Sequence, residues 1–308
     1  MSPIKVAIIG VGKIVQDQHA PVLRADPDFE IVAAASPNST LEGVPTYKTP
    51  DEMLAAHPEI DAVSVCTPPQ IRHALALQAL RARKHVLLEK PPGATVSEVT
   101  DLTAFAAEQQ LTLFATWHSR HAAGVEPAQA WVKAHKLKSV EVIWREDVRR
   151  WHPGQAWIWK AGGLGVFDPG INALSIVTRI LPPFFLRDAQ LEFPSNCDAP
   201  IAAKLNGAVE GGGVITCDFD WRQTGPQTWD VRIEAEGGAS LRLSMGGEQM
   251  EIDGKPVQLK AQSEYASIYR HFAELVRGGK SDVDVSPLQQ VADAFMLGRR
   301  IAVDPFIE

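Results

Sequence analysis

An alternation of short apolar runs with helical patterns, over the first 116 residues, is the feature that most constrains the fold of this 308-residue chain. Helical patterns occupy residues 70–82 and 96–110. Strands that are apolar on both faces are typical of parallel sheets, and parallel neighbours need crossover connections, usually helices. The alternation therefore predicts an α/β fold with a doubly wound parallel sheet, whose strands are the apolar runs 4–9, 29–35, 61–67, 85–89 and 111–116.

The loops after these strands carry the expected ligand contacts, because ligands of doubly wound sheets lie beyond the carboxyl ends of the strands. The first strand leads into Gly10-Val11-Gly12. In a dinucleotide site the first glycine permits a tight turn, the second lets the pyrophosphate approach the backbone, and a third lets the helix pack closely. The third position here is Val15, so the two glycines alone also fit an ordinary turn after a strand. The alternating context favours a nicotinamide dinucleotide, with these expected contacts: Gly10, Gly12, Lys13, Ile14, Ser36, Asn38, Ser39, Thr67, Pro68, Glu89 and Lys90.

The loop after the second strand bears on the choice between NAD and NADP. NAD-specific sites usually place a carboxylate there to bind the ribose 2′-hydroxyl. This chain has Ala35-Ser36-Pro37-Asn38-Ser39-Thr40 instead, which offers hydroxyl and amide donors and no negative charge. NADP is therefore compatible with the loop. NAD also remains open, because no arginine is present there to bind a 2′-phosphate.

Composition restricts the class of protein. A length of 308 residues suits two domains, and 45% hydrophobic with 22% charged residues is typical of a soluble globular chain. The net charge of −7 argues against a nucleic-acid partner. The three cysteines, Cys66, Cys197 and Cys217, fit neither a disulfide framework nor a zinc site, so no metal is implied and reduced thiols are expected. No run resembles a signal peptide or a membrane span, and a cytoplasmic protein is expected.

Several motifs together resemble one known family. The stretch His85 to Pro92 ends a buried strand with Glu89-Lys90-Pro91, and a glycine run, Gly162-Gly163-Leu164-Gly165, precedes Asp168 and Asn172. With the Gly10 to Ile14 loop and Thr67-Pro68-Pro69, these motifs resemble the family of glucose-fructose oxidoreductase and inositol 2-dehydrogenase over essentially the whole chain.

The resemblance implies two domains and a homo-oligomer, dimer or tetramer. It implies a Rossmann cofactor domain over residues 1–118, then a substrate-binding and oligomerisation domain over 119–308, built on a large, mostly antiparallel, open-faced sheet. Alternating patterns at 139–146, 212–221 and 229–236 predict strands of that sheet. Apolar patterns at 265–276 and 287–301 predict helices.

Two positions depart from the usual family pattern. Arg72 and His73 occupy the region after the Thr-Pro loop where the family commonly has another His. The residue four after the family's catalytic Asp is usually His and here is Asn172, an amide that cannot accept a proton at neutral pH. The Asp168-to-Asn172 spacing, with the segment 146–155, is similar to the sugar 1-dehydrogenase branch of the family. That branch implies oxidation of the anomeric hydroxyl of D-galactose, L-arabinose or D-fucose to the lactone.

Oxidation at C1 requires hydride transfer to the nicotinamide and a base for the hydroxyl proton. Asp168 is the expected base, with Lys90 bonded to the reacting oxygen and Asn172 orienting the hydroxyl; alternatively Lys90 is the base, its pKa lowered by burial and the nicotinamide charge. Polar groups and an aromatic face are expected around a sugar ring. The expected substrate contacts are Lys90, His118, Glu146, Trp151, His152, Asp168, Asn172 and Trp229.

Plainer interpretations stay open. Asp168 and Pro169 fit the start of a helix, with the Asp as N-cap. A single tryptophan or histidine in this set is as well explained by packing. The same fold also suits a regulator that binds dinucleotide and sugar without redox chemistry, or a dehydrogenase of another polyol.

Overall fold

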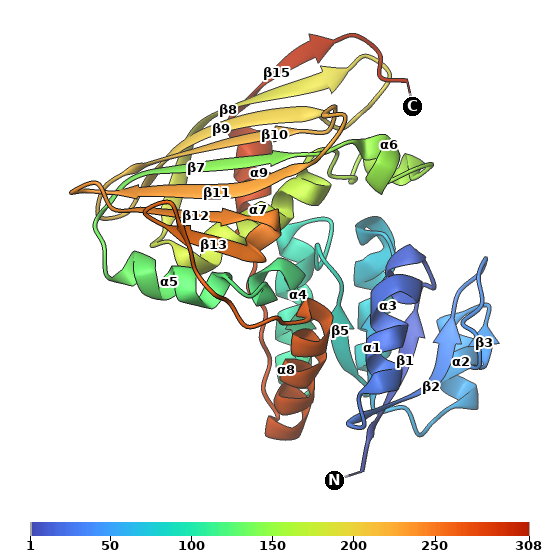
Figure 1. Cartoon of the computed structure of the whole chain (residues 1–308). Coiled ribbons are helices and arrows are strands. Elements are labelled where there is room, and N and C mark those ends of the chain that lie inside the picture. Colours follow the sequence, from blue (N-terminus) through green and yellow to red (C-terminus); the bar gives the residue numbers. More distant parts are fainter. Residues whose placement is uncertain (1, 308) are drawn as a thin grey trace. The chain divides into compact units, whose positions relative to one another are not determined.

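The computed structural model describes residues 2–307 and divides them into two compact units (Figure 1). The first unit runs to His118 and also includes Ser263–Val285. The second unit comprises Ser119–Gln262 and the residues from Ser286 onward. None of the described helices is long and apolar enough to cross a bilayer.

The first unit contains a six-stranded parallel sheet of order β3-β2-β1-β4-β5-β6. The chain winds outward from β1 to β3 and then returns to β4 beside β1, so the direction of winding changes between β1 and β4. This doubly wound α/β arrangement confirms the predicted fold class. Its strands are β1 (Ile4–Ile9), β2 (Phe29–Ala35), β3 (Thr46–Tyr47), β4 (Ala62–Val65), β5 (His85–Leu88) and β6 (Leu113–Ala115).

Helices of the first unit begin with recognisable local signals. Thr49 and Thr95 each form a capping box with a Glu three residues later. The turn after the glycine loop is a π-helix, η1 (Val15–His19), which runs into α1 (Ala20–Ala25). The other helices are α2 (Pro50–Ala56), α3 (Pro69–Arg81), α4 (Val96–Glu108) and α8 (Glu264–Gly278). The 3-10 turn η2 (His118–His121) begins at the last residue of the first segment and continues into the second unit.

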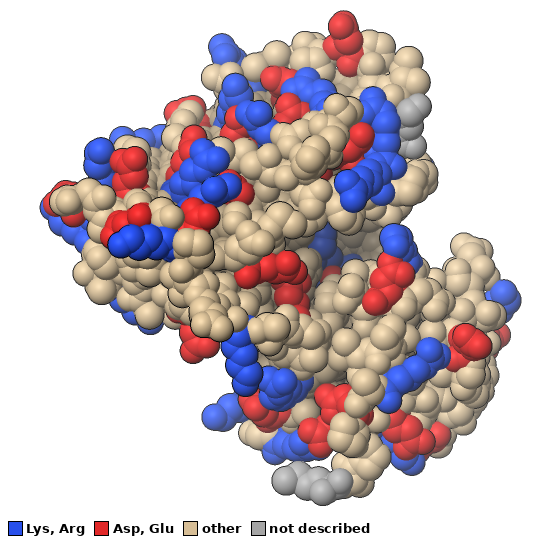
Figure 2. All heavy atoms as spheres, viewed as in Figure 1, with Lys and Arg blue, Asp and Glu red and all other residues tan. Residues whose placement is uncertain are grey.

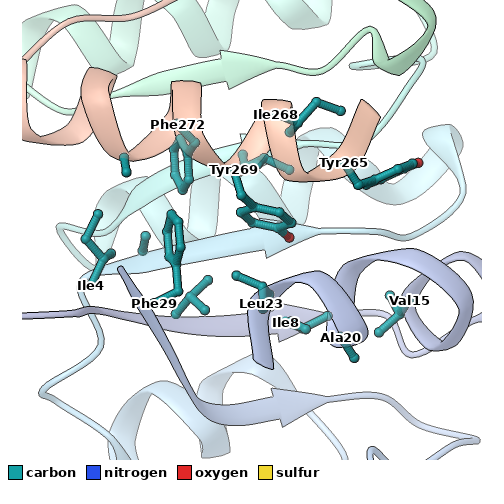
Figure 3. Packing of buried hydrophobic residues seen from close by; sticks show 14 of the residues in the cluster. Ile4, Ile8, Val15, Ala20, Leu23, Phe29, Tyr265, Ile268, Tyr269 and Phe272 are labelled. Carbon is teal, nitrogen blue, oxygen red and sulfur yellow. The ribbon is translucent and has the colours of Figure 1, made fainter. Parts of the chain in front are cut away.

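Helix α8 lies in the first unit although it comes late in the chain. Its side chains Tyr265, Tyr269 and Phe272 enter a buried cluster with residues of β1, α1 and β2 (Figure 3). The rings of Phe29 and Phe272 stack with centroids 6.4 Å apart. Residues 263–285 therefore belong with residues up to 118, whereas the sequence placed them within a single second domain, 119–308. The pattern predicted the helix but carried no information on which sheet it covers.

The second unit is built on a nine-stranded sheet of order β14-β13-β12-β11-β7-β10-β9-β8-β15. Most neighbours are antiparallel, and β7 with β10 and β8 with β15 are parallel. This mostly antiparallel sheet confirms the large second sheet that was predicted. Its strands are β7 (Leu137–Arg145), β8 (Phe184–Pro194), β9 (Ala202–Val209), β10 (Val214–Asp220), β11 (Thr228–Ala235), β12 (Ser240–Ser244), β13 (Gln249–Ile252), β14 (Lys255–Pro256) and β15 (Gly298–Val303).

The predicted helix over 287–301 is wrong at its end. Helix α9 (Ser286–Leu297) stops, and the chain continues as the edge strand β15. At the junction a Cβ on Gly298 would lie 2.5 Å from the Ala294 carbonyl oxygen, so only glycine fits there. The remaining helical segments are α5 (Val125–Lys133), α6 (Val148–Trp151), η3 (Ala156–Trp159), α7 (Phe167–Ile180) and η4 (Met245–Gly247).

The two faces of the nine-stranded sheet differ in chemistry. Helices α7 and α9 pack against one face, where alternate residues of β7 such as Val140 and Val142 are buried. The opposite face carries ion pairs between neighbouring strands, including Arg232 with Glu141 at 3.2 Å and Arg242 with Asp230 at 2.9 Å. Acidic and basic side chains are likewise interspersed over the surface seen in Figure 2.

Candidate functional site

The glycine loop after β1 has no room for a side chain at Gly10, whereas the space around Gly12 is empty. Gly10 has φ +90°, and a Cβ there would lie 2.7 Å from Cγ2 of Thr67. Around Gly12, by contrast, a Cβ would meet nothing within 4 Å. A tight turn followed by accessible backbone at the sheet's switch point fits a pyrophosphate. Val15, in place of the third glycine, is fully buried, and its side chain packs in the core cluster of the first unit.

The loops after β4 and β5 are joined by a buried arginine. Arg72 on α3 donates to the carbonyl oxygens of Thr67, Glu89 and Pro91. The Thr67 hydroxyl is buried and has no hydrogen-bond partner among the described residues, so it is available to a ligand at the cofactor loops. Sequence reasoning noted Arg72 only as a departure from the family pattern, because the carbonyl groups that it binds have no sequence signature.

A lysine lies beside the loop that the sequence associated with cofactor choice. Ser36 is buried and donates its N–H to the Tyr47 carbonyl at 2.9 Å, while Asn38 and Ser39 are exposed. Lys48, which follows β3, donates from Nζ to the Pro37 carbonyl at 2.9 Å. Sequence reasoning missed this ammonium group. The parallel pairing of β2 with β3 is what brings residue 48 to the end of β2.

Glu89 is the centre of a buried polar cluster in the first unit. Its carboxylate accepts from the Tyr265 hydroxyl at 2.6 Å and from the backbone N–H of Lys90 at 2.6 Å. The Nε2 atom of His19 lies 3.1 Å from the same carboxylate. Burial alone would raise the pKa of Glu89, but the hydrogen bond and charge of His19 hold that pKa well below its usual range. Glu89 is therefore ionised inside the protein.

His118 lies beside this cluster. Its ring stacks on Tyr265 with centroids 5.7 Å apart, and its Nδ1 is 2.7 Å from the Glu264 carboxylate. Burial acts to lower the pKa of His118, and the neighbouring Glu264 outweighs it and raises that pKa. His118 is thus poised to carry a positive charge in the first unit.

In the second unit the glycine run brings α7 close to its neighbours. A Cβ on Gly163 would lie 2.4 Å from the Trp157 carbonyl oxygen, and one on Gly165 would lie 2.3 Å from that of Pro200. Helix α7 begins at Phe167 after Val166, and no side chain caps it. The interpretation of Asp168 as the N-cap is therefore wrong. Asp168 lies inside the first turn, is 3% exposed, and precedes the half-buried Asn172 by one turn.

Three predicted residues meet in what we call the carboxylate cluster: Glu146, His152 and Asp168. His152 Nε2 lies 3.6 Å from Asp168 Oδ2 and 3.8 Å from Glu146 Oε1. The Glu146 carboxylate also accepts from the indole N–H groups of Trp221 at 3.1 Å and Trp229 at 2.9 Å. Two buried carboxylates on one histidine form a site that can accept and hold a proton.

Aromatic rings adjoin the carboxylate cluster. Trp229 packs against Trp151 with centroids 5.3 Å apart and against Trp144 at 5.8 Å. Trp221 is not among the substrate contacts expected from the sequence, and it is fully buried, yet its indole N–H donates to the Glu146 carboxylate. Trp221 follows β10 and Glu146 follows β7. The pairing of these two strands brings the residues together, and the sequence does not reveal that pairing.

Comparisons with known proteins show the family to which the chain belongs. A sequence model of an oxidoreductase family with an NAD-binding Rossmann fold matches residues 4–116. The galactose 1-dehydrogenase of Pseudomonas fluorescens is 43% identical over 309 residues, which cover 100% of both chains.

Solved structures are also similar. The crystal structure of D-galactose 1-dehydrogenase from Rhizobium etli is 57% identical and has a TM-score of 0.95, covering 100% of this chain and 99% of that one. A 3-ketoreductase of Actinomadura kijaniata, solved with NADP and TDP-benzene, is 19% identical with a TM-score of 0.84 over 98% of this chain and 99% of that one. This more distant likeness shows a shared fold.

Proposed function

Because this chain belongs to the oxidoreductase family with an NAD-binding Rossmann fold, we propose that it is a nicotinamide-dependent aldose 1-dehydrogenase. The proposed reaction oxidises the anomeric hydroxyl of D-galactose to the lactone, with L-arabinose and D-fucose as further candidate substrates. The observation that carries the proposal is the carboxylate cluster, in which Asp168 and Glu146 converge on His152. The full-length similarity to D-galactose 1-dehydrogenases supports the choice of sugar.

The first unit supplies the proposed cofactor contacts. The accessible backbone at Gly12 would bind the pyrophosphate, and the Thr67 hydroxyl and the Lys90 loop would contact the rest of the dinucleotide. When bound, the nicotinamide supplies a hydride acceptor. The loop after β2 is compatible with either NAD or NADP.

The proposed chemistry divides among three residues. Asp168 accepts the proton of the anomeric hydroxyl while the C1–H bond breaks and the C1–O bond becomes a carbonyl. Lys90 donates a hydrogen bond to the reacting oxygen, and Asn172 orients the hydroxyl. In the alternative, Lys90 takes the proton and Asp168 holds the sugar. His118, Glu146 and His152 are proposed to bind sugar hydroxyls, and Trp151 and Trp229 to offer an apolar face to the ring.

Substrate assays test the reaction. The protein is mixed with D-galactose, L-arabinose, D-glucose or inositol, with NAD or NADP, and the absorbance of the reduced cofactor is followed. Reduction with D-galactose and none with inositol is expected. Reduction with inositol alone would point to a polyol dehydrogenase, and none with any sugar would point to a regulator that only binds.

Two variants test the roles. Asp168→Asn and Lys90→Met are each expected to lower kcat by about 100-fold or more, because each removes a group that acts on the proton or the reacting oxygen. Asp188→Asn, on the exposed face of β8, is the matched control and should keep normal turnover. Normal turnover in both Asp168→Asn and Lys90→Met would overturn the proposal.

A homo-oligomer, dimer or tetramer, in the cytoplasm is part of the same proposal. Within the second unit, α7 and α9 cover one face of the nine-stranded sheet, and the other face carries the ion pairs of Arg232 and Arg242. Light scattering of the purified protein is expected to give a mass that is two or four times 33.6 kDa. A monomeric mass would contradict this part of the proposal.

A further inference from the structure

His19 is a fully buried histidine with no part in the reaction proposed above. It ends the π-helical turn η1, directly after the glycine loop, and its side chain has no exposed surface. Its ring meets the edge of Tyr265 at a centroid distance of 4.9 Å and that of Tyr269 at 5.7 Å. Both tyrosines come from α8, far along the chain (Figure 3). The position of His19 is therefore fixed by contacts with a helix that is distant in the sequence.

Both ring nitrogens of His19 have polar neighbours. Nδ1 lies 2.6 Å from the Tyr269 hydroxyl, which in turn lies 3.1 Å from the Ser64 hydroxyl on β4. Nε2 lies 3.1 Å from Oε1 of Glu89, with the Cys66 sulfur at 3.6 Å. A doubly protonated ring would donate from both nitrogens, and the Tyr269 hydroxyl would donate onward to Ser64.

The carboxylate of Glu89 also forms a hydrogen bond with the backbone of Lys90. Oε1 of Glu89 accepts from the Tyr265 hydroxyl, and Oε2 accepts from the backbone N–H of Lys90. The carboxylate that accepts from the Lys90 backbone is thus itself held by His19 and Tyr265.

We propose that His19, Tyr265 and Tyr269 are positioning residues for Lys90, acting through the carboxylate of Glu89. They join the turn after the glycine loop, helix α8 and the loop after β5 in one buried hydrogen-bonded chain. None of the three is proposed to touch substrate. They fix the atom from which the Lys90 side chain starts, and hence where its ammonium group can reach.

The electrostatics agree with the geometry. Burial alone would lower the pKa of His19, yet its neighbours Cys66, Tyr269 and Glu89 raise that pKa well above the ordinary value. A cation and an anion thus face each other away from solvent. Removal of either charge leaves the other without compensation, so the pair resists rearrangement.

The chain provides a matched control. His57 also lies between a tyrosine and a glutamate, with Nε2 3.0 Å from the Tyr47 hydroxyl and Nδ1 3.0 Å from Glu59. Glu59 is exposed, and the partners of His57 lie in β3 and after α2, outside the loop that carries Lys90. The variants His19→Gln and His57→Gln therefore make the same chemical change in a buried and an exposed pair.

Hydrogen exchange of the full chain, read by mass spectrometry without cofactor or sugar, is the primary test. The Lys90 amide is expected to exchange about five- to tenfold faster in His19→Gln and Tyr265→Phe, because each loses a hydrogen bond that orders its acceptor. In His57→Gln its exchange should match the wild type. Unchanged exchange of this amide in folded Tyr265→Phe, a conservative variant, would overturn the proposal even if His19→Gln fails to fold.

Kinetics extend the test and rest on the proposed function. In Tyr265→Phe and Tyr269→Phe, kcat is expected to fall about 10- to 100-fold, with the KM for the cofactor within about threefold of wild type. A raised cofactor KM with normal kcat would overturn the proposal, since it would assign these residues to the glycine loop instead. If the wild type oxidises no sugar, the proposed function fails, and the exchange measurement still decides the positioning role.

Discussion

At the scale of single residues, we expect the side chains around the end of β2 to determine the choice between NAD and NADP. Ser36 is buried there, and Asn38 and Ser39 are exposed beside the carbonyl that Lys48 binds. An ammonium group at this loop attracts the negative charge of a 2′-phosphate, whereas its attraction to a neutral 2′-hydroxyl is weak. Lys48 thus supplies the positive charge that the sequence pattern, lacking an arginine, did not reveal.

Lys48→Met is expected to lower kcat/KM for NADP by about two- to tenfold and to leave that for NAD nearly unchanged, because the exposed charge is screened by solvent. Steady-state kinetics with both cofactors measure the ratio. Lys84→Met is the control, since Lys84 also donates to backbone carbonyls, those of Pro58 and Ile60. An equal loss with NAD and NADP would contradict a role in phosphate recognition.

Glu146 is the second residue whose change has a defined expectation. A glutamine in its place offers one acceptor oxygen to two indole N–H groups, so one indole loses its partner. Glu146→Gln should cost about 1–3 kcal/mol of unfolding free energy and raise the KM for sugar. Denaturant unfolding and kinetics measure both, and Glu141→Gln on the ion-paired face of β7 is the control. An unchanged sugar KM would remove Glu146 from the proposed sugar site.

At the scale of elements, helix α3 links two loops through the hydrogen bonds of Arg72. The three carbonyl groups that it binds belong to the loops after β4 and β5, which carry Thr67 and Lys90. A helix that follows one strand thereby binds the end of the next and links the two loops.

Arg72→Met is expected to destabilise the chain by about 2–4 kcal/mol, because three buried carbonyl groups lose their donor. Urea unfolding measures this loss. Arg81→Met, in the exposed last turn of the same helix, should change stability by less than about 0.5 kcal/mol. Similar values for the two variants would mean that solvent satisfies the loop carbonyls.

Elements were more predictable than their contacts. The apolar runs predicted β1, β2, β4, β5 and β6 because buried parallel strands have a distinct composition, whereas the two-residue β3 has too little sequence to be detected. The glycine run and Asp168 pointed to α7, but the start of that helix is set by tertiary packing around Gly163 and Gly165.

The candidate site was predictable only in part. Glu146, His152 and Asp168 were named from motifs, and the structure brings them together in the second unit. His19 and Tyr269 form a hydrogen bond across 250 residues of sequence, and no local pattern can indicate such a pair. The sequence did not reveal the roles of Arg72, Lys48 and Trp221 for the same reason, since their partners are backbone groups or side chains of distant segments.

At the scale of the whole molecule, buried histidines and a buried carboxylate make stability depend on pH. The folded pKa values of His19 and His118 are raised, so their contribution is fully present below the unfolded value of 6.5 and is lost as pH rises through the folded values. The folded pKa of Glu89 is lowered, so its contribution is present above the unfolded value of 4.5 and is lost as pH falls. Together these three groups stabilise the folded state most between pH 4.5 and pH 6.5, the unfolded pKa values of glutamate and histidine.

The midpoint temperature of unfolding is therefore expected to fall as pH rises above 6.5. Thermal scans at a series of pH values on wild type and His118→Gln measure the effect, and the decline should be shallower in the variant because one titrating group is gone. His73→Gln, at an exposed pair with Asp101, is the control and should follow the wild-type curve. Parallel curves for wild type and His118→Gln would show that His118 does not carry the effect.

The placement of α8 has a consequence for how the protein is made. A ribosome releases residues up to 118 long before residues 263–285, yet the core around Phe29 and Ile8 is completed by Tyr269 and Phe272 from that late segment. Residues up to 118 therefore keep an open apolar surface while residues 119–262 are translated. Nascent chains halted before residue 263 should accordingly be sensitive to protease and bound by chaperones, and those halted after α8 has emerged should be resistant.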